Sequence, residues 1–433
     1  MAKYWFETLG CPKNQVDSDR LMARLESSGF EEASDVVDAD VVVVNTCAFI
    51  DAAREESIET ILELSSMKSN SAKLVVTGCL AQRYYAELSE SIPEIDIVAR
   101  FGEDFTEAAS LGKKIVRRSK ASINTESSAL GPLPAMDLLR LPRRRSRAPW
   151  AYVKVAEGCN KNCGFCSIPS FRGRQVSKSI DEIRREVEEL GIVEAVLVAQ
   201  DLANYGIDIY GHPSLVKLYD TISTMVPWVR LLYVYPTGLT DPLIERVASS
   251  SVPYFDLSLQ HVSAPHLRRM RRVGSAKTVL GKIEKIRSLR PEAVFRTSFI
   301  LGYPGETEED QEVLKAFIEE AELDWVGFFP FSLEEGTFAA GLPGQVDRSL
   351  ALERINELSE IQDRVTRVKR MSLIGKEITV LVEADGRARS FREAPEIDGV
   401  CFVGSSAVIG GFMTGRVGEI NGVDLVVEAD NKL

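Results

Sequence analysis

The sequence predicts an α/β protein built from a parallel sheet, a partial parallel barrel and a small C-terminal β-barrel. Valine-rich runs alternate with amphipathic helical stretches over the first 110 residues, which is typical of a parallel sheet covered on both faces. Six strand-and-helix repeats follow between residues 150 and 331. The last 62 residues contain short strands separated by glycine turns, which is typical of a small barrel.

The N-terminal part is expected to alternate strand and helix three times. The three strand-like runs are KYWFETLGC, DADVVVVNTC and KLVVTGC, and the helical stretches are Asp17 to Ser28, AFIDAAREESIETILEL and AQRYYAELSESI. In a sheet of this kind, ligands gather beyond the carboxyl ends of the strands.

The middle part is expected to form a barrel of six strands, with function at their carboxyl ends. The strand-like runs are WAYVKVAE, EAVLVAQ, VRLLYVYP, YFDLSLQ, VFRTSFILG and WVGFFPF, and a long helix from about Leu350 to Met371 follows them. We therefore expect four segments: the N-terminal sheet domain at 1–112, a linker at 113–148, the barrel with its long helix at 149–371, and the small β-barrel at 372–433. We interpret 113–148 as a solvated linker, because it is rich in Ser, Ala, Gly and Pro and then strongly basic.

Composition and charge exclude some classes of protein. No run reaches the roughly 18 apolar residues of a membrane helix, and the N-terminus lacks the apolar core of a secretory signal. We therefore expect a cytoplasmic protein that does not bind membranes. The net charge of −12 disfavours non-specific binding of nucleic acid along the whole surface and would attract a basic partner.

Seven cysteines in a chain of this kind are expected to be thiols, metal ligands or catalytic groups. Cys11, Cys47 and Cys79 each fall at the carboxyl end of a predicted strand and before a helix, so they should converge in space. The alternative is three small residues buried in strand-to-helix turns.

Cys159, Cys163 and Cys166 form a Cys-x3-Cys-x2-Cys cluster directly after the first barrel strand. Structural zinc usually takes four ligands, and no second cysteine pair lies nearby. A 4Fe–4S cube held by three thiolates leaves one iron with an open coordination position. We therefore expect a cube at which a ligand binds the open iron; a zinc knuckle or a chance cluster is the alternative.

This spacing resembles the radical S-adenosylmethionine (SAM) superfamily, and further motifs resemble its methylthiotransferase family over nearly the whole chain. They are LGCPKNQVDSD, NTCAFIDAAREESI, VVTGCLAQRYY, GCNKNCGFCSIPSFRG, VAQD with YGIDIY, YVYP, LQH, RTSFILGYPGETEED and SLEEGT. The resemblance implies a Rossmann- or flavodoxin-like methylthiotransferase domain, a partial TIM-type radical SAM barrel and a TRAM domain.

The resemblance also implies two 4Fe–4S clusters and SAM as cofactors. Cys159, Cys163 and Cys166 would hold the radical SAM cube. Cys11, Cys47 and Cys79 would hold a second, auxiliary cluster that presents sulfur for transfer. Cys401 matches neither set and is interpreted as a buried apolar residue.

Candidate SAM contacts are residues near the ends of barrel strands: Gln200, Asp201, Gln260, Arg296 and the turn Gly302–Pro304–Gly305. Barrel packing and loop geometry are the alternative for each of them. Thr307 with Asp310 is interpreted as a helix capping box. The three histidines, His212, His261 and His266, are too scattered to suggest a metal site.

Within the family, the wording CSIPSFRG and LGCPKNQVDS resembles the RimO type. Enzymes of that type add a methylthio group to the β-carbon of an aspartate in small-subunit ribosomal protein twelve. Residues 372–433 contain six basic and ten acidic residues, so strong RNA binding is not expected there. An acidic module fits a basic ribosomal protein. The alternatives are methylthiolation of isopentenylated adenosine in transfer RNA and a non-catalytic iron–sulfur carrier.

The implied reaction uses SAM twice. One molecule donates a methyl group to sulfur on the auxiliary cluster, and another yields the radical that abstracts hydrogen from the aspartate. Both clusters must then serve one cavity. A low-potential electron donor such as flavodoxin or ferredoxin is implied as a partner, and we expect a monomer.

Overall fold

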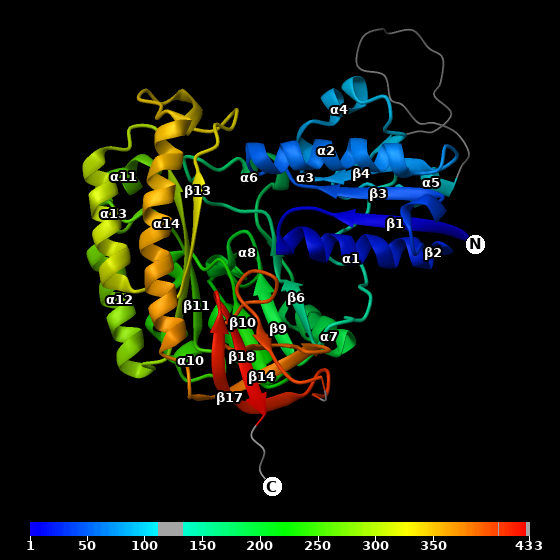
Figure 1. Cartoon of the computed structure of the whole chain (residues 1–433). Coiled ribbons are helices and arrows are strands. Elements are labelled where there is room, and N and C mark those ends of the chain that lie inside the picture. The colour runs from blue at the N-terminus through cyan, green and yellow to red at the C-terminus, as the bar shows by residue number, and fades with distance from the viewer. Residues whose placement is uncertain (111–132, 406, 430–433) are drawn as a thin grey trace. The chain divides into compact units, whose positions relative to one another are not determined.

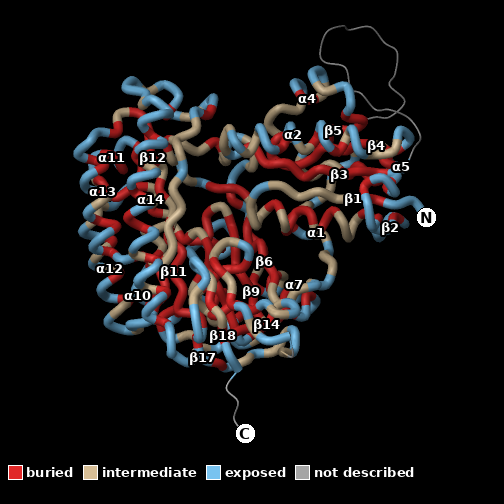
Figure 2. Tube along the Cα trace, in the orientation of Figure 1, coloured by how far each residue is buried: buried red, intermediate tan, exposed pale blue. Residues whose placement is uncertain are grey.

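The computed structural model describes residues 1–110, 133–405 and 407–429, which divide into two compact units. Unit 1 contains Met1–Arg144 together with Ser170–Gly173, and unit 2 contains Arg145–Pro169 and Arg174–Leu433. Figure 1 shows the elements in chain order, and Figure 2 shows that buried residues gather along the strands of each unit. No helix among these described residues is long and apolar enough to cross a membrane.

Unit 1 is built on a five-stranded parallel sheet with the order β2-β1-β3-β4-β5. Its strands are β1 (Ala2–Thr8), β2 (Phe30–Glu32), β3 (Val41–Thr46), β4 (Lys73–Gly78) and β5 (Ile97–Val98). This order is the flavodoxin-like one, in which ligands bind beside the switch point between β1 and β3. The predicted parallel sheet is confirmed, whereas β2 and β5 were not predicted, because two or three residues carry no periodicity.

Helices cover both faces of this sheet. The central strand β3 shows this, because its alternate side chains point to opposite faces and each set packs against helices. Val42 and Val44 share a core with side chains of α2 (Asp51–Met67), α3 (Cys79–Arg83) and α4 (Tyr85–Ser91). Val41 and Val43 share a core with side chains of α1 (Pro12–Ser27) and α5 (Thr106–Ser110). Both faces of β3 are therefore buried, which explains its uninterrupted valines.

Most of the predicted linker 113–148 lies outside the described residues, because 111–132 are not described. In the part that is described, Arg145 and Arg147 are exposed, as expected of a solvated segment, but two neighbouring arginines are not. The Arg143 side chain is only 4% exposed and pairs with Asp19, and Arg144 pairs with Glu26 at 3.2 Å and Glu32 at 2.5 Å. The interpretation of this basic run as solvated is therefore wrong for these two residues, because they neutralise acidic groups of unit 1.

Unit 2 begins with an arc of six strands in chain order, which confirms the predicted partial barrel. The strands are β6 (Trp150–Lys154), β9 (Glu194–Val198), β10 (Trp228–Leu231), β11 (Tyr254–Gln260), β12 (Val294–Leu301) and β13 (Trp325–Pro330). They form two parallel three-stranded sheets that a parallel bridge between Val234 and Leu257 connects. Two short strands, β7 (Ala156–Glu157) and β8 (Val176–Ser177), follow the first strand and pair antiparallel across the long loop between them.

Helices lie on the outer side of this arc (Figure 1). The longer ones are α7 (Ile180–Leu190), α9 (Leu215–Ser223), α10 (Asp241–Ala248), α12 (Ala276–Leu289), α13 (Glu308–Ala321) and α14 (Arg348–Met371). Short helices α8 (Ile207–Tyr210) and α11 (Ala264–Arg269) lie in the connections. Helix α6 (Ile168–Arg172) begins in unit 2, and its last three residues belong to unit 1. Thr307 caps α13 and Asp310 closes the capping box, as predicted.

The C-terminal residues form a closed barrel with the order β14-β15-β16-β18-β17. Its strands are β14 (Glu377–Ala384), β15 (Arg387–Ser390), β16 (Cys401–Phe402), β17 (Phe412–Asn421) and β18 (Asp424–Ala429). Cys401 is fully buried in its core, as expected. Strand β15 was not predicted, because RARS has no apolar alternation.

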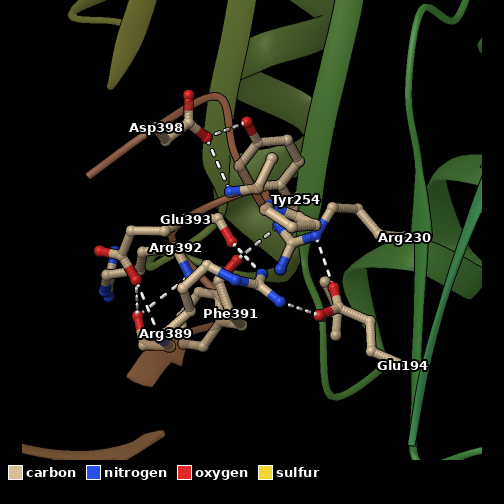
Figure 3. Close-up of polar contacts among 12 residues, drawn as sticks. Glu194, Arg230, Tyr254, Arg389, Phe391, Arg392, Glu393 and Asp398 are labelled. Atoms are coloured by element: carbon tan, nitrogen blue, oxygen red, sulfur yellow. Dashed lines mark hydrogen bonds and ion pairs between the residues drawn. The ribbon is translucent and has the colours of Figure 1, made fainter. Parts of the chain in front are cut away.

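Buried ion pairs join this small barrel to the large one within unit 2 (Figure 3). Glu194 of β9 accepts hydrogen bonds from Arg230 of β10 at 2.8 Å and from Arg389 of β15 at 2.6 Å. All three side chains are at most 1% exposed. Because an unpaired charge at such a site is strongly unfavourable, these contacts hold the two barrels in one arrangement.

Candidate metal centres

The first candidate centre lies at the carboxyl edge of the sheet of unit 1. Cys11 follows β1, Cys47 follows β3 and Cys79 follows β4, and the pairs Thr8↔Asn45 and Thr46↔Gly78 align these strand ends. Two of the cysteines therefore flank the switch point between β1 and β3, and the third follows the adjacent strand.

Side chains and a glycine draw the three loops together. The Asn14 amide donates to the carbonyl oxygens of Leu9 and Thr46, each at 3.0 Å, so it ties the loop of Cys11 to that of Cys47. A Cβ atom at Gly10 would lie 2.8 Å from the Sγ atom of Cys47, and Gly10 has a φ of +92°. Only glycine permits this close approach without strain.

The three thiols are close enough to influence one another's ionisation. Burial and the neighbouring Cys79 and Cys11 raise the pKa of Cys47 to about 12. Burial also raises the pKa of Cys79, although the Arg172 guanidinium opposes it. Burial acts against ionisation of Cys11 as well, but Lys13 and Arg172 lower its pKa overall. A bound metal would take these thiols as thiolates.

The second candidate centre is the loop that carries Cys159, Cys163 and Cys166, directly after β7. The Lys161 amide donates to the Sγ atom of Cys159 at 3.3 Å, and the Cys166 amide donates to the Cys163 carbonyl at 3.1 Å. Burial raises the pKa of Cys159 to about 11 and that of Cys166 to about 12, and nearby thiols add to both shifts. These three residues also form one group of interacting thiols.

Three residues around this loop were missed by the sequence analysis. Arg272, only 5% exposed, reaches the Sγ atom of Cys163 at 3.5 Å and stacks over the Tyr235 ring at 4.0 Å. Lys161 lies over the same ring at 4.6 Å. Arg272 ends the basic run RRMRR, and Tyr235 belongs to the motif YVYP. Both segments stand out in the sequence, but nothing in them indicates that they lie beside the cysteines.

Gln200 and Asp201 lie just beyond the carboxyl end of β9, beside this loop. Gln200 donates to Glu157 at 2.6 Å, and Asp201 lies 3.9 Å from the Lys161 ammonium group. The Oε1 atom of Gln200 and the Oδ1 atom of Asp201 are buried acceptors without a partner among the described residues. Gln260 ends β11 with a φ of +68°, so it also lies at the carboxyl end of a strand.

Arg296 lies at the opposite end of its strand, which corrects its predicted place near SAM. It is the third residue of β12, whose carboxyl end is Leu301. Its guanidinium pairs with Asp256 at 3.2 Å and with Asp398 at 3.4 Å. Figure 3 shows Asp398 beside Tyr254, whose hydroxyl donates to it at 2.5 Å. Arg296 therefore belongs to the contact between the two barrels.

The glycines after β12 are explained by packing and backbone conformation. Gly302 has a φ of +81°, and a Cβ atom there would lie 2.6 Å from the Cβ atom of Ala351 in α14. Gly305, three residues after Gly302 and next to Pro304, has a φ of +75° and faces Arg269. Packing and loop geometry, the alternative given for these residues from the sequence, therefore account for both glycines.

Two of the histidines are not scattered, which corrects the sequence interpretation. The rings of His261 and His266 lie 4.5 Å apart, and Glu306 completes a buried group of three potential ligands. However, Glu306 already accepts hydrogen bonds from Arg354 and the Gly302 amide, both at 2.7 Å. A second cation beside Arg354 would be repelled, so we assign this group to packing. His212 is exposed and separate.

The donor chemistry of each set of three cysteines suits an iron–sulfur cluster, which takes thiolate ligands. Both sets supply thiols alone, in loops close to buried cations that would offset the charge of thiolates. The seventh cysteine is enclosed in the small barrel, so it is not a fourth ligand for either set.

Family models match three parts of the chain in order. The model described as "Uncharacterized protein family UPF0004" matches residues 3–100, "Radical SAM superfamily" matches 153–317, and "TRAM domain" matches 374–429. A radical SAM methyltransferase, TsrM from Kitasatospora setae, has a similar fold. Its TM-score is 0.50 at 17% identity, over 76% of this chain and 75% of its own. The fold and the Cys159–Cys166 loop therefore define a radical SAM enzyme, and this class implies SAM and one 4Fe–4S cluster.

Relatives that match nearly the whole chain narrow the class of radical SAM enzyme. A protein of Moorella thermoacetica named "Ribosomal protein uS12 methylthiotransferase RimO" is 43% identical over 95% of this chain and 96% of its own. Proteins of the same name from Aquifex aeolicus and Thermotoga maritima are 41% and 40% identical, over 92% and 94% of this chain and 90% and 95% of their own. This chain belongs to the RimO family of radical SAM methylthiotransferases.

Proposed function

We propose that this enzyme adds a methylthio group to the β-carbon of an aspartate in ribosomal protein uS12. The choice of substrate rests on the relatives, which are named ribosomal protein uS12 methylthiotransferases, and the acidity of the chain agrees with a basic protein partner. The observation that supports the chemistry is the gathering of Cys11, Cys47 and Cys79 at one sheet edge, in addition to the cysteine loop of the barrel.

We propose that each group of three cysteines holds one 4Fe–4S cluster. When bound, the cluster of the barrel loop and SAM supply an adenosyl radical, and the second cluster supplies the sulfur that is transferred. The chain binds and orients these groups. Arg272 and Lys161 place positive charge beside the barrel cysteines, and Tyr235 holds both side chains.

The unpartnered acceptors of Gln200 and Asp201 are proposed to bind the ribose hydroxyls or the amino group of SAM. Both atoms are buried beside the cysteine loop, where a donor from a ligand would relieve the cost of leaving them unsatisfied. Gln260 is proposed as a further contact because it ends the strand that precedes His261. Arg296 is not among the proposed contacts, because its guanidinium pairs with Asp256 and Asp398.

We propose a low-potential donor such as flavodoxin or ferredoxin, a monomeric enzyme, and a cytoplasmic location where ribosomal proteins are made. The TRAM domain is proposed not to bind RNA strongly, because its net charge is −4.

Iron and sulfide analysis tests the cluster count. In anaerobically prepared protein we expect about two cubes in the parent and about one in each of Cys11→Ala and Cys159→Ala. Cys401→Ala is the matched control and should keep both cubes, since Cys401 lies in the core of the small barrel. Equal iron in Cys11→Ala and the parent would exclude a cluster on the first set.

The substrate is tested by mass spectrometry of purified uS12 and of transfer RNA after incubation with SAM and a reductant. Added methylthio mass on uS12 alone supports the proposal. Modification of transfer RNA alone would favour the other branch, and failure to release 5′-deoxyadenosine would favour a non-catalytic carrier.

A further inference from the structure

Four residues that follow the barrel cysteines belong to unit 1. The chain joins unit 1 at Ser170, four residues after Cys166, and returns to unit 2 after Gly173. Phe171 packs against the hydrophobic core on the α2 face of the sheet. The next side chain, Arg172, is only 3% exposed. This short segment is therefore anchored inside unit 1.

The Arg172 guanidinium contacts the first group of cysteines directly. Its Nη2 atom lies 3.2 Å from the Sγ atom of Cys79 and 2.7 Å from the Oδ1 atom of Asn14. Its Nη1 atom donates to Asp17 at 3.0 Å, and its Cζ atom lies 4.0 Å from the centre of the Phe101 ring. Asn14 is the same residue that ties the loops of Cys11 and Cys47 together.

These contacts fix the direction of the guanidinium. Asp17 is 1% exposed and holds one nitrogen, while the Phe101 ring holds the plane of the group. Because the fork of donors is rigid, the nitrogen facing Cys79 is placed without further loss of side-chain freedom. An N–H group aimed at a cluster sulfur raises the reduction potential, since it stabilises the added negative charge.

We propose that Arg172 is a positioning residue for the second cluster: it orients Cys79 through an N–H···S hydrogen bond and raises the potential of the cluster. This inference rests on the proposed function, because it requires a cluster on Cys11, Cys47 and Cys79. The segment thus places a residue from the sequence neighbourhood of one cysteine set against a ligand of the other.

The test uses the full chain with Cys159→Ala, which should retain the second cluster alone. Arg172→Gln and Arg172→Lys are compared with Arg174→Gln, an exposed arginine of the same loop. Iron content and a redox titration followed by electron paramagnetic resonance are measured. At the midpoint potential of the Cys159→Ala parent, Arg172→Gln should show about a tenfold lower ratio of reduced to oxidised cluster. For one electron this is a shift of about 59 mV.

Arg172→Lys keeps the charge without the rigid fork, so a shift in the same direction but smaller is expected. If Arg172→Gln assembles no cluster but melts like Arg174→Gln by circular dichroism, the positioning role is supported. If Arg172→Gln does not fold, the shift in reduction potential of Arg172→Lys tests the inference instead. A parent-like potential and iron content in the folded Gln variant, or in the Lys variant when only that one folds, would overturn the inference. Absence of any cluster in the Cys159→Ala parent would instead overturn the proposed function on which the inference rests.

Discussion

Arg296 and Gly302 lie six residues apart on one strand and turn, yet their positions give them unrelated roles. Arg296 is near the amino end of β12 and joins Asp256 and Asp398, whereas Gly302 follows the carboxyl end and packs against Ala351. Residue type and a place near a predicted strand end suggested a cofactor contact for both. The direction of the strand places Arg296 away from the carboxyl edge, and the path of α14 gives Gly302 a packing role.

Gly302→Ala should destabilise the enzyme by at least about 2 kcal/mol, because it adds a steric clash to an unfavourable φ. Ala351→Gly removes the other methyl group, so the double variant should be more stable than the sum of the two single effects predicts. The free energy of unfolding in urea measures both. Strict additivity would show that the Ala351 contact is not the reason for the glycine.

His266 should make stability fall in acid. Burial lowers its pKa to about 4 from an ordinary value near 6.5, so the unfolded chain binds a proton that the folded chain does not. This contribution is fully present above pH 6.5 and is lost as the pH falls from 6.5 toward 4, by up to about 1.4 kcal/mol per pH unit.

The measurement is the unfolding free energy of the iron-free protein between pH 7.5 and 5. His266→Phe should reduce its slope with pH, whereas His212→Asn, at an exposed position, should not. Identical slopes in the parent and His266→Phe would show that His266 titrates normally.

At the scale of elements, the attachment of the small barrel depends on strand β15. Its Arg389 bonds Glu194 of β9 (Figure 3). It also bonds Glu383 of β14, so one side chain connects two sheets. Despite burial, these carboxylates raise the pKa of Arg389, and it therefore stays charged in the interior. The arrangement of the TRAM domain on the barrel is thus set by a short polar strand.

Arg389→Met should cost about 3–5 kcal/mol, because it leaves Glu194 with only Arg230 in a buried site. The expected result is a lower melting temperature, with little recovery in low salt because buried pairs are weakly screened. Arg184→Met is the control; its pair with Glu188 is exposed and should matter by less than about 1 kcal/mol. Equal melting temperatures for the two variants would contradict this account.

At the scale of the whole molecule, the net charge of −12 is spread over a chain whose proposed substrate is basic. Charges of this size steer association more than they strengthen the final complex. Raising salt from about 50 to 300 mM should therefore increase KM for uS12 several-fold, as the Debye length shortens. KM for SAM should change much less, since the proposed contact atoms of Gln200 and Asp201 are buried and therefore weakly screened. A KM for uS12 that is independent of salt would show that charge does not guide this encounter.

The strand and helix order and the two cysteine sets were determined by the sequence itself. Valine runs, helical periods and the spacing from Cys159 to Cys166 are local patterns, and strands such as β3 and β9 follow from burial on both faces. The meeting of Cys11, Cys47 and Cys79 at one edge also follows from topology, because parallel strands end together.

Tertiary structure alone decided the partners of these residues. The contact of Arg172 with Cys79 spans 93 positions of the chain, and that of Arg272 with Cys163 spans 109. The two histidine rings, His261 and His266, meet across 5 positions. Each of these side chains is of a type that permits many partners. Arg296 and Arg389 likewise acquire their roles from strand direction and from the docking of β15. Local sequence patterns specify which surfaces are buried, but the packing of distant segments selects which charged groups face one another.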